Sequence, residues 1–334
     1  MTRVPFMPEI LARIAPRIGA TVELEPNYRF VGLVRFANGR RSFFWDNKFN
    51  LNPISSVKVV QDKAYASHFL RTMGYQVPEE RTFFRDRFRR HVEGPGRADA
   101  IAYAHQLGWP VYVKPLSLSQ GRLVSRVHDE DELGRAIDAI FATERSLLIQ
   151  RPCPGEDHRI VVLDGRVLTA CKRSPLSVVG DGAHSVDALL VERQRRFDAE
   201  RRDTRIPTDD PRIDAALARD RLDRTSVLPH GRTVRLLDVA NLSLGGTAED
   251  VTARVHPTVA ALAARAARDM DLRYCGVDLL LDDVAAPLDA YTIVELNSAP
   301  GLDYYTGHGP AHEAHVDDLY LQVLCAVGGV DPPG

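Results

Sequence analysis

The sequence is poor in two residue types whose scarcity is informative. Its 334 residues hold four cysteines, with no CxxC pair among them: Cys153, Cys171, Cys275 and Cys325. We therefore expect reduced, packed thiols and no disulfide framework or zinc site. Lysine is also scarce, because arginine supplies most of the positive charge; the five lysines are Lys48, Lys58, Lys63, Lys114 and Lys172. A lysine is a compact point charge that suits phosphate, so each of these positions is of interest.

The sequence also lacks a large net charge of either sign, and it lacks long apolar runs. The formal net charge of −2 argues against binding nucleic acid through bulk charge, and we expect no nucleic-acid partner. No apolar run approaches the length of a membrane span, and the first residues lack the apolar core of a signal peptide. The expected location is the cytoplasm, without a membrane partner.

Turn signals and hydrophobic periodicity predict a mixed α+β or α/β fold in three parts. An N-terminal domain, residues 1–90, holds a hairpin around Asn38-Gly39 and then a helical stretch that ends at Gly74. A small α+β unit follows over residues 91–151, and a larger unit over residues 152–334 opens with a hairpin around Asp164-Gly165. An arginine-rich segment, 191–224, predicts a solvated helix pair in the larger unit.

Two predicted strands near the C-terminus carry oxygen-bearing side chains. "GVDLLL" supplies Asp278, and "TIVELN" supplies Glu295 and Asn297, which share one strand face. If the strands pair as an antiparallel hairpin, the three side chains lie together, and a hard cation such as Mg²⁺ would offset their charge. The alternative is that Glu295 pairs with an arginine and Asn297 caps the following turn.

Two other segments have the chemistry of phosphate binding. "PVYVKP" places Lys114 at a strand end before the small polar loop 116–122, which contains Gly121. The segment "ANLSLGGTAEDVT" is a second glycine-rich loop and contains Asn241. The Walker A pattern GxxxxGK[ST] is absent, so a P-loop is excluded.

Read in order, several segments resemble the ATP-grasp family. They are "QDKAYASHFLRTMGYQVPE", "WPVYVKPLSLSQGR", "LLIQRPCPGEDHRIVVLDGRVLTACKR", "GDGAHSV", "NLSLGGTAEDVT" and "CGVDLLL…IVELNSAPGL", and they span roughly residues 57–305. The similarity is to the ATP-grasp part of cyanophycin synthetases and, more distantly, to glutathione synthetases and D-alanine–D-alanine ligases. The resemblance implies an ATP-grasp fold, in which two α+β subdomains hold a nucleotide between them.

The resemblance also implies roles for individual residues. The Mg²⁺ ligands would be Asp278, Glu295 and Asn297, with Glu295 bridging two ions and Mn²⁺ as an alternative cation. ATP would be bound by Lys63, Lys114, Ser119, Gln120, Gly121, Gln150, Asp157 and Lys172. The transferred phosphate and the substrate would be contacted by Arg159, Arg173 and Asn241. From the residues alone, Arg159 has the alternative of pairing with Asp157 or Glu156, and Lys172 that of a solvated surface lysine.

The sequence departs from the cyanophycin-type pattern in three places. Leu123 replaces a second glycine of the phosphate-covering loop, and Gln150-Arg151 stands where a glutamate is common. The Mur-ligase-like domain has no counterpart in the 334 residues, so we do not expect a cyanophycin synthetase.

The leading interpretation is an ADP-forming carboxylate–amine ligase that acts on amino acids or a small peptide through an acyl phosphate. A second interpretation changes the acceptor to a carrier protein or a larger peptide, with Phe43, Phe44 and Trp45 as candidate docking residues. A third is a nucleotide-binding module without catalysis. The resemblance implies a homodimer. Loops 116–122 and 174–186 and the segment 191–224 are candidate lids.

Overall fold

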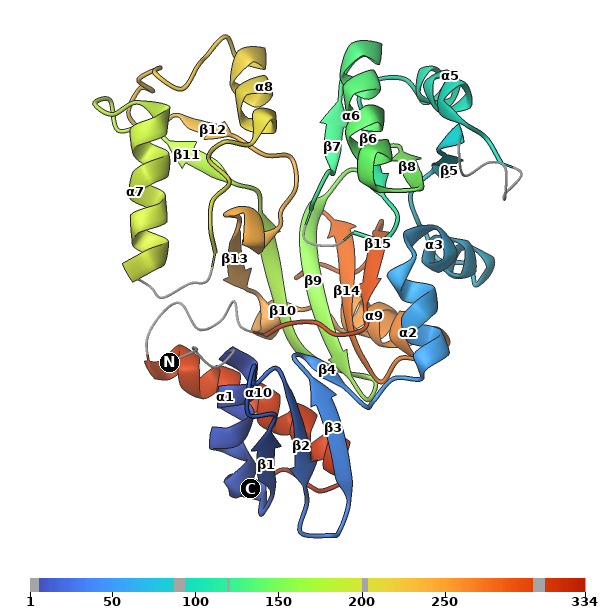
Figure 1. Ribbon diagram of the computed structural model, residues 1–334, viewed down its shortest axis with the longest axis vertical. Helices are drawn as coiled ribbons and strands as arrows, with labels where there is room; N and C mark the ends of the chain where they lie inside the picture. The colour runs from blue at the N-terminus through green and yellow to red at the C-terminus, as the bar shows by residue number, and fades with distance from the viewer. Residues whose placement is uncertain (1–5, 87–93, 119–120, 200–203, 303–309, 334) are drawn as a thin grey trace.

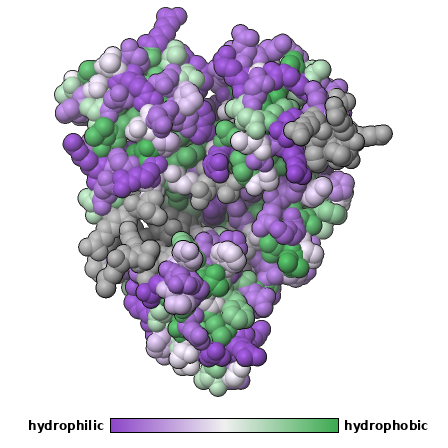
Figure 2. All heavy atoms as spheres, viewed as in Figure 1, coloured by the Kyte–Doolittle hydropathy of each residue, from purple (hydrophilic) through white to green (hydrophobic). Residues whose placement is uncertain are grey.

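The computed structural model describes residues 6–86, 94–118, 121–199, 204–302 and 310–333. Its helices and strands form a lower lobe and two upper lobes that flank a central sheet (Figure 1). Figure 2 shows a groove between the upper lobes, whose surfaces are mostly hydrophilic on this face. Within the described ranges, none of the helices combines the length and apolar character that a membrane span requires.

The lower lobe brings the two ends of the described chain together. It contains α1 (Phe6–Ile14), η1 (Ala15–Ile18) and a sheet in the order β1 (Thr21–Leu24), β2 (Val31–Arg35), β3 (Arg41–Trp45) and β4 (Lys48–Phe49). The last helix, α10 (Pro310–Gly328), packs against α1 and β3 and shares their hydrophobic core. Strands β2 and β3 form the hairpin predicted at Asn38-Gly39, which is confirmed.

The right-hand upper lobe is a four-stranded sheet covered by two helices. Its strand order is β5 (Glu80–Phe84), β8 (Ser146–Gln150), β6 (Val111–Pro115) and β7 (Ser125–Val127). Helices α5 (Arg97–Leu107) and α6 (Glu130–Thr143) bury one sheet face in a core that includes Phe83, Val113 and Ile149. Strand alternation turns Glu80, Tyr112, Lys114 and Gln150 to the other face.

The central sheet carries the C-terminal half of the fold. Its order is β13 (Thr247–Asp250), β10 (Arg166–Ser174), β9 (Glu156–Leu163), β14 (Tyr274–Leu281) and β15 (Thr292–Asn297), and the predicted hairpin at Asp164-Gly165 joins β9 to β10. One face packs on α9 (Pro257–Asp269), which follows η3 (Thr252–Arg254), and on α2 (Ile54–Gln61) and α3 (Lys63–Thr72).

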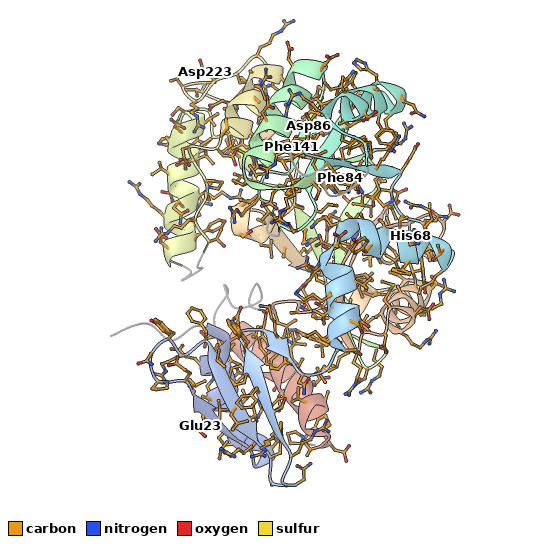
Figure 3. All side chains as sticks on the ribbon, turned by 45° about the vertical axis from the view of Figure 1, so that its right-hand side comes forward. Glu23, His68, Phe84, Asp86, Phe141 and Asp223 are labelled. Carbon is orange, nitrogen blue, oxygen red and sulfur yellow. The ribbon has the colours of Figure 1, made fainter. Side chains whose placement is uncertain are left out.

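The left-hand upper lobe is an insert between β10 and β13. It consists of β11 (Ser177–Val179), α7 (Val186–Ala199), α8 (Pro211–Arg219), β12 (Thr233–Arg235) and η2 (Leu242–Leu244), with a hydrophobic core of its own. The predicted helix pair of the arginine-rich segment corresponds to α7 and α8, although α7 begins earlier, at Val186. Asp223, labelled in Figure 3, lies in the insert at the end of the molecule opposite Glu23 of the lower lobe.

Candidate active site

The predicted pairing of the two C-terminal strands is confirmed. Strands β14 and β15 are antiparallel, and Asp278 lies directly opposite Glu295, while Asn297 lies opposite Gly276. A register shift between Asp278 and Leu279 inserts one extra residue on β15. This bulge keeps Ile293 and Leu296 in the core and leaves the polar residues together on the other face.

Strand β9 adds a basic residue to the same face. Arg159 pairs in register with Asp278 on β14, and its Nε and terminal nitrogen donate to the two carboxylate oxygens at 2.7 and 2.8 Å. Arg173 of β10 lies 2.9 Å from Asp278 Oδ2 and 2.6 Å from Asp157 Oδ1. The alternative pairing of Arg159 with Asp157 or Glu156 is therefore not the main one, because Asp278 takes its guanidinium in bidentate geometry.

These contacts set the ionisation of the acidic residues. Burial raises the pKa of Asp278, but the attraction of Arg159 and Arg173 outweighs it and lowers the pKa to about 2. For Asp157 burial is the dominant effect and raises the pKa, although Arg173 opposes it. The site is therefore a network of alternating charges in which Asp278 stays ionised at neutral pH.

Lys63 lies at the other edge of this face, next to Glu295. The sequence pattern suggested one continuous helix here, but the chain breaks at Asp62, whose carboxylate accepts hydrogen bonds from the backbone N–H groups of Ala64 and Tyr65. This N-cap makes Lys63 the first residue of α3. Its Nζ is 3.5 Å from Glu295 Oε1 and donates to the carbonyl oxygen of Leu118 at 3.1 Å. Lys63 thus links the acidic residues to loop 116–122.

Lys114 projects from β6 toward the same region. Its Nζ lies 5.3 Å from the centre of the Tyr112 ring. Burial lowers the pKa of Lys114, and the attraction of Glu80 and Glu295 opposes this shift in part. A bound polyanion close to Nζ would favour the ammonium form.

Glu80 is a residue of this region that the sequence did not single out. It lies in register with Gln150 on β8, which is 4% exposed, and its Oε1 is buried without a hydrogen-bond partner. Burial raises the pKa of Glu80, although Ser67, Lys114 and other groups oppose the shift. The signal available in the sequence was a second consecutive glutamate at the start of an apolar strand, which is weak.

The remaining predicted residues fall in different places. Lys172 lies on the opposite face of β10 from Arg173, in register with His158, and its Nζ is 2.6 Å from Glu156 Oε2. The structure therefore does not bring Lys172 to the acidic face. Ser119 and Gln120 lie outside the described residues.

The loop that contains Gly121 contacts the segment that contains Asn241. Gly121 has a φ of +70°, and a Cβ added to it would lie 2.5 Å from Asn241 Oδ1. Leu123, where the family has a glycine, also adopts a positive φ, of 56°. The backbone of this loop thus has the left-handed conformation that favours glycine, although the residue there is leucine.

The oxygen donors fit a hard cation only in part. Oδ2 of Asp278 already accepts bonds from Arg159 and Arg173, and Asn297 Nδ2 is 3.4 Å away from it. Within the described ranges, no three His, Cys, Asp or Glu side chains come together as a metal site. Carboxylate and amide oxygens suit Mg²⁺, which commonly completes its shell with water and substrate phosphates. The residues therefore fit a cation that arrives with a nucleotide.

Comparison with known proteins gives the family. Residues 238–309 match the model of the RimK-like ATP-grasp domain. The chain is 31% identical over 288 residues to cyanophycin synthetase of Nostoc sp., a match that covers 81% of this chain and 30% of that protein. It is 29% identical over 259 residues to the glutathione biosynthesis bifunctional protein GshAB of Streptococcus mutans, covering 73% of this chain and 32% of that protein. The chain thus spans about a third of the length of these relatives.

Solved structures agree on the fold. The chain superposes on a bifunctional glutathione synthetase from Pasteurella multocida with a TM-score of 0.56 at 20% identity, covering 91% of this chain and 42% of that one. The D-alanine–D-alanine ligase from Bacillus anthracis gives a TM-score of 0.50 at 16% identity, covering 83% and 70% of the two chains. The predicted fold is confirmed, and the chain belongs to the ATP-grasp superfamily.

Proposed function

We propose that this chain is an ATP-dependent, ADP-forming carboxylate–amine ligase that acts on an amino acid or a small peptide. The observation that carries the proposal is a cluster of charged side chains beside the loop of Gly121. Lys63, at the start of α3, meets a face of the central sheet that presents Glu295, Asp278, Arg159 and Arg173. A purely structural cluster would not need a partly exposed carboxylate beside a lysine that also bonds to a glycine-containing loop.

The proposed reaction has two steps. A carboxylate oxygen of the substrate attacks the γ-phosphorus of ATP, and the bond between that phosphorus and the β–γ bridging oxygen breaks to release ADP. The amine nitrogen then attacks the acyl carbon, the bond to the phosphate oxygen breaks, and the amine loses a proton to solvent. Phosphorylation makes the carboxylate reactive because phosphate is a far better leaving group than oxide.

We assign the side chains by charge and position. Lys63 and Lys114 would bind phosphate oxygens, and Arg159 and Arg173 would stabilise the transferred phosphoryl group and the substrate carboxylate. Gln150 and Asp157 would contact the adenine and ribose side of the nucleotide, and Asn241 would lie near the acyl phosphate. Glu295, Asn297 and the free lone pairs of Asp278 would hold Mg²⁺, which neutralises charge on the phosphates when bound. Exclusion of water would protect the acyl phosphate from hydrolysis.

ADP release over a panel of amino acids and dipeptides tests this function. ADP formed with a carboxylate and amine pair, and lost in Glu295→Ala, supports the ligase. Tight ATP binding without ADP release over the whole panel would favour a binding module instead. Because Glu295 is partly exposed and lies in no apolar core, we expect the variant to fold, which a thermal unfolding curve would check.

A second candidate has the same activation step with an acidic peptide or carrier protein as acceptor. The observation in its favour is the outer face of the N-terminal sheet, where Phe43 and Trp45 are 70% and 64% exposed, whereas Phe44 is buried. Arg35 lies directly opposite Arg41 on this face, and among the residues that the structure describes only Arg35 of the two has an ion-pair partner, Glu23. An acidic partner would relieve the unfavourable arginine pair. ADP release that requires such a partner and falls in Trp45→Ala would select this candidate.

A further inference from the structure

One arginine of the insert holds the phosphate-covering loop of the opposite lobe. Arg212, in the first turn of α8, donates through one terminal nitrogen to the carbonyl oxygen of Gly121 at 3.1 Å and to that of Val124 at 2.6 Å. Both acceptors are backbone groups of the loop between β6 and β7. Figure 1 shows α8 on the left, facing β7 and α6 on the right.

A contact within the insert also holds the guanidinium of Arg212 in place. Asp210, the N-cap of α8, accepts bonds from Arg212 Nε at 3.0 Å and from its other terminal nitrogen at 2.6 Å. A planar guanidinium fixed along one edge presents its remaining N–H groups in a set direction. The side chain is only 23% exposed, so water competes weakly for these bonds.

The two carbonyl groups lie on either side of Leu123. This residue has a φ of 56°, a conformation that leucine rarely adopts. Its side chain packs against the core of the small lobe. A loop with an unfavourable backbone conformation needs contacts that hold it, and the bonds of Arg212 before and after Leu123 supply them.

Other contacts join the same two lobes around this point. Arg219 of α8 lies 3.9 Å from Glu132 of α6, and Arg126 of β7 lies 3.7 Å from Asp238 of the insert. The hydroxyl of Tyr112 donates to the carbonyl oxygen of Asp238 at 3.3 Å. The bonds of Arg212 therefore exist only while the insert is docked on the small lobe.

We propose that Arg212 is a positioning residue, which orders loop 121–124 over the nucleotide site when the insert docks. It acts through the loop backbone, since its contact with Gly121, a predicted ATP-binding residue, is to the carbonyl oxygen. The effect on nucleotide binding rests on the proposed function; the effect on the loop itself does not. The insert would thus dock on the small lobe and order this part of the nucleotide site in the same step.

Trypsin offers a direct test, because Arg122 is exposed within the loop and cleavage after it requires the loop to open. We expect Arg212→Gln to speed cleavage of the Arg122–Leu123 bond about tenfold, since cleavage follows the open population. Arg212→Lys should lie between wild type and Gln, because an ammonium cannot bond Asp210 along an edge and both carbonyls together. Mass spectrometry of the fragments measures each rate.

Arg224→Gln is the matched control. Arg224 has the same 23% exposure and two acidic partners, Asp214 and Asp187, but these lie within the insert. We expect its cleavage rate after Arg122 to equal that of wild type. Equal rates for Arg212→Gln, Arg212→Lys and wild type would overturn the proposal, as would equal acceleration in Arg224→Gln.

A second readout separates this proposal from the proposed function. Adding Mg²⁺ with a non-hydrolysable ATP analogue should slow cleavage after Arg122 in wild type and less so in Arg212→Gln. If the analogue fails to bind wild type, the proposed function is wrong, yet the difference between the variants without nucleotide still decides the role of Arg212. Cleavage throughout the chain would indicate unfolding of the Gln variant, and the Lys variant then decides.

Discussion

Arg159 and Asp278 are bonded side by side across β9 and β14, through two parallel N–H···O contacts of 2.7 and 2.8 Å. They are 119 residues apart in the sequence, and the register of the central sheet places them opposite each other. The same carboxylate also meets Arg173. Asp278 therefore organises both arginines proposed to act on the phosphoryl group, in addition to its predicted role toward Mg²⁺.

Removing the charge of Asp278 should destabilise the fold. In Asp278→Asn two largely buried guanidinium groups lose their shared counter-ion, and we expect the free energy of unfolding to fall by about 3 kcal/mol. Urea unfolding at neutral pH measures this loss. The exposed neighbour Asp282 is the control, and Asp282→Asn should change stability by less than about 0.5 kcal/mol. Equal effects of the two variants would contradict the prediction.

The same carboxylate should contribute to stability in a pH-dependent way. Folding lowers the pKa of Asp278 from 3.8 to about 2, so the ionised form is favoured in the folded state. Its contribution is therefore fully present above about pH 4 and is lost as the pH falls toward 2. The stability difference between wild type and Asp278→Asn should shrink over that window. A difference that stays constant from pH 5 to pH 2 would argue against the ion pair.

Neutralising Glu80 should have the opposite sign. Its pKa is raised above 4.5 by burial, so the ionised form opposes folding, and stability is lost as the pH rises through the folded-state pKa. We expect Glu80→Gln to be more stable than wild type at pH 7 by about 1 kcal/mol, because the substitution removes a negative charge that burial disfavours. The gain should vanish below pH 4.5.

Chemical denaturation at several pH values tests this prediction. Glu79→Gln is the control, since Glu79 is half-exposed and paired with Arg151 at the surface, where a single ion pair contributes little. A Glu80→Gln variant that is less stable than wild type at pH 7 would contradict the prediction. It would show that the attraction between the Glu80 carboxylate and Lys114 outweighs the cost of burying the charge.

A methyl group at Gly121 should disturb the nucleotide site. In Gly121→Ala the new Cβ would lie 2.5 Å from Asn241 Oδ1 and 2.9 Å from Leu244 Cδ1, in a backbone with φ of +70°. We expect ATP affinity to fall about tenfold, as calorimetric titration would measure, because about 1–2 kcal/mol of strain accompanies the left-handed conformation. Gly39→Ala, with φ of +82° and open space around it, should leave ATP affinity unchanged.

Removing the ammonium of Lys63 should weaken ATP binding without unfolding the chain. Lys63→Met keeps the apolar stem but removes the ion pair with Glu295 and the hydrogen bond to the carbonyl oxygen of Leu118. We expect a loss of at least about tenfold in ATP affinity. Lys58→Met, on an exposed position of α2, is the control. Similar affinities for both variants would remove Lys63 from the proposed site.

Local signals in the sequence were sufficient for the parts of the site that lie on neighbouring strands. Asp164-Gly165 dictates the tight hairpin between β9 and β10, and period-2 alternation puts Glu295 and Asn297 on one face of β15. The order of the ATP-grasp segments gave the fold. These features depend on backbone conformation and strand alternation, which neighbouring residues largely decide.

Contacts between distant segments were decided only by the tertiary structure. The sequence left the partner of Arg159 open, and the register between β9 and β14 selected Asp278. Hydrophobic periodicity alone predicted one helix where the structure has α2 and α3, separated at Asp62, whose carboxylate caps α3. Arg212 gave no signal at all, because its partners are backbone carbonyl groups about 90 residues earlier. Such pairings depend on how whole lobes pack against each other, and the residue type at a single position does not predict that packing.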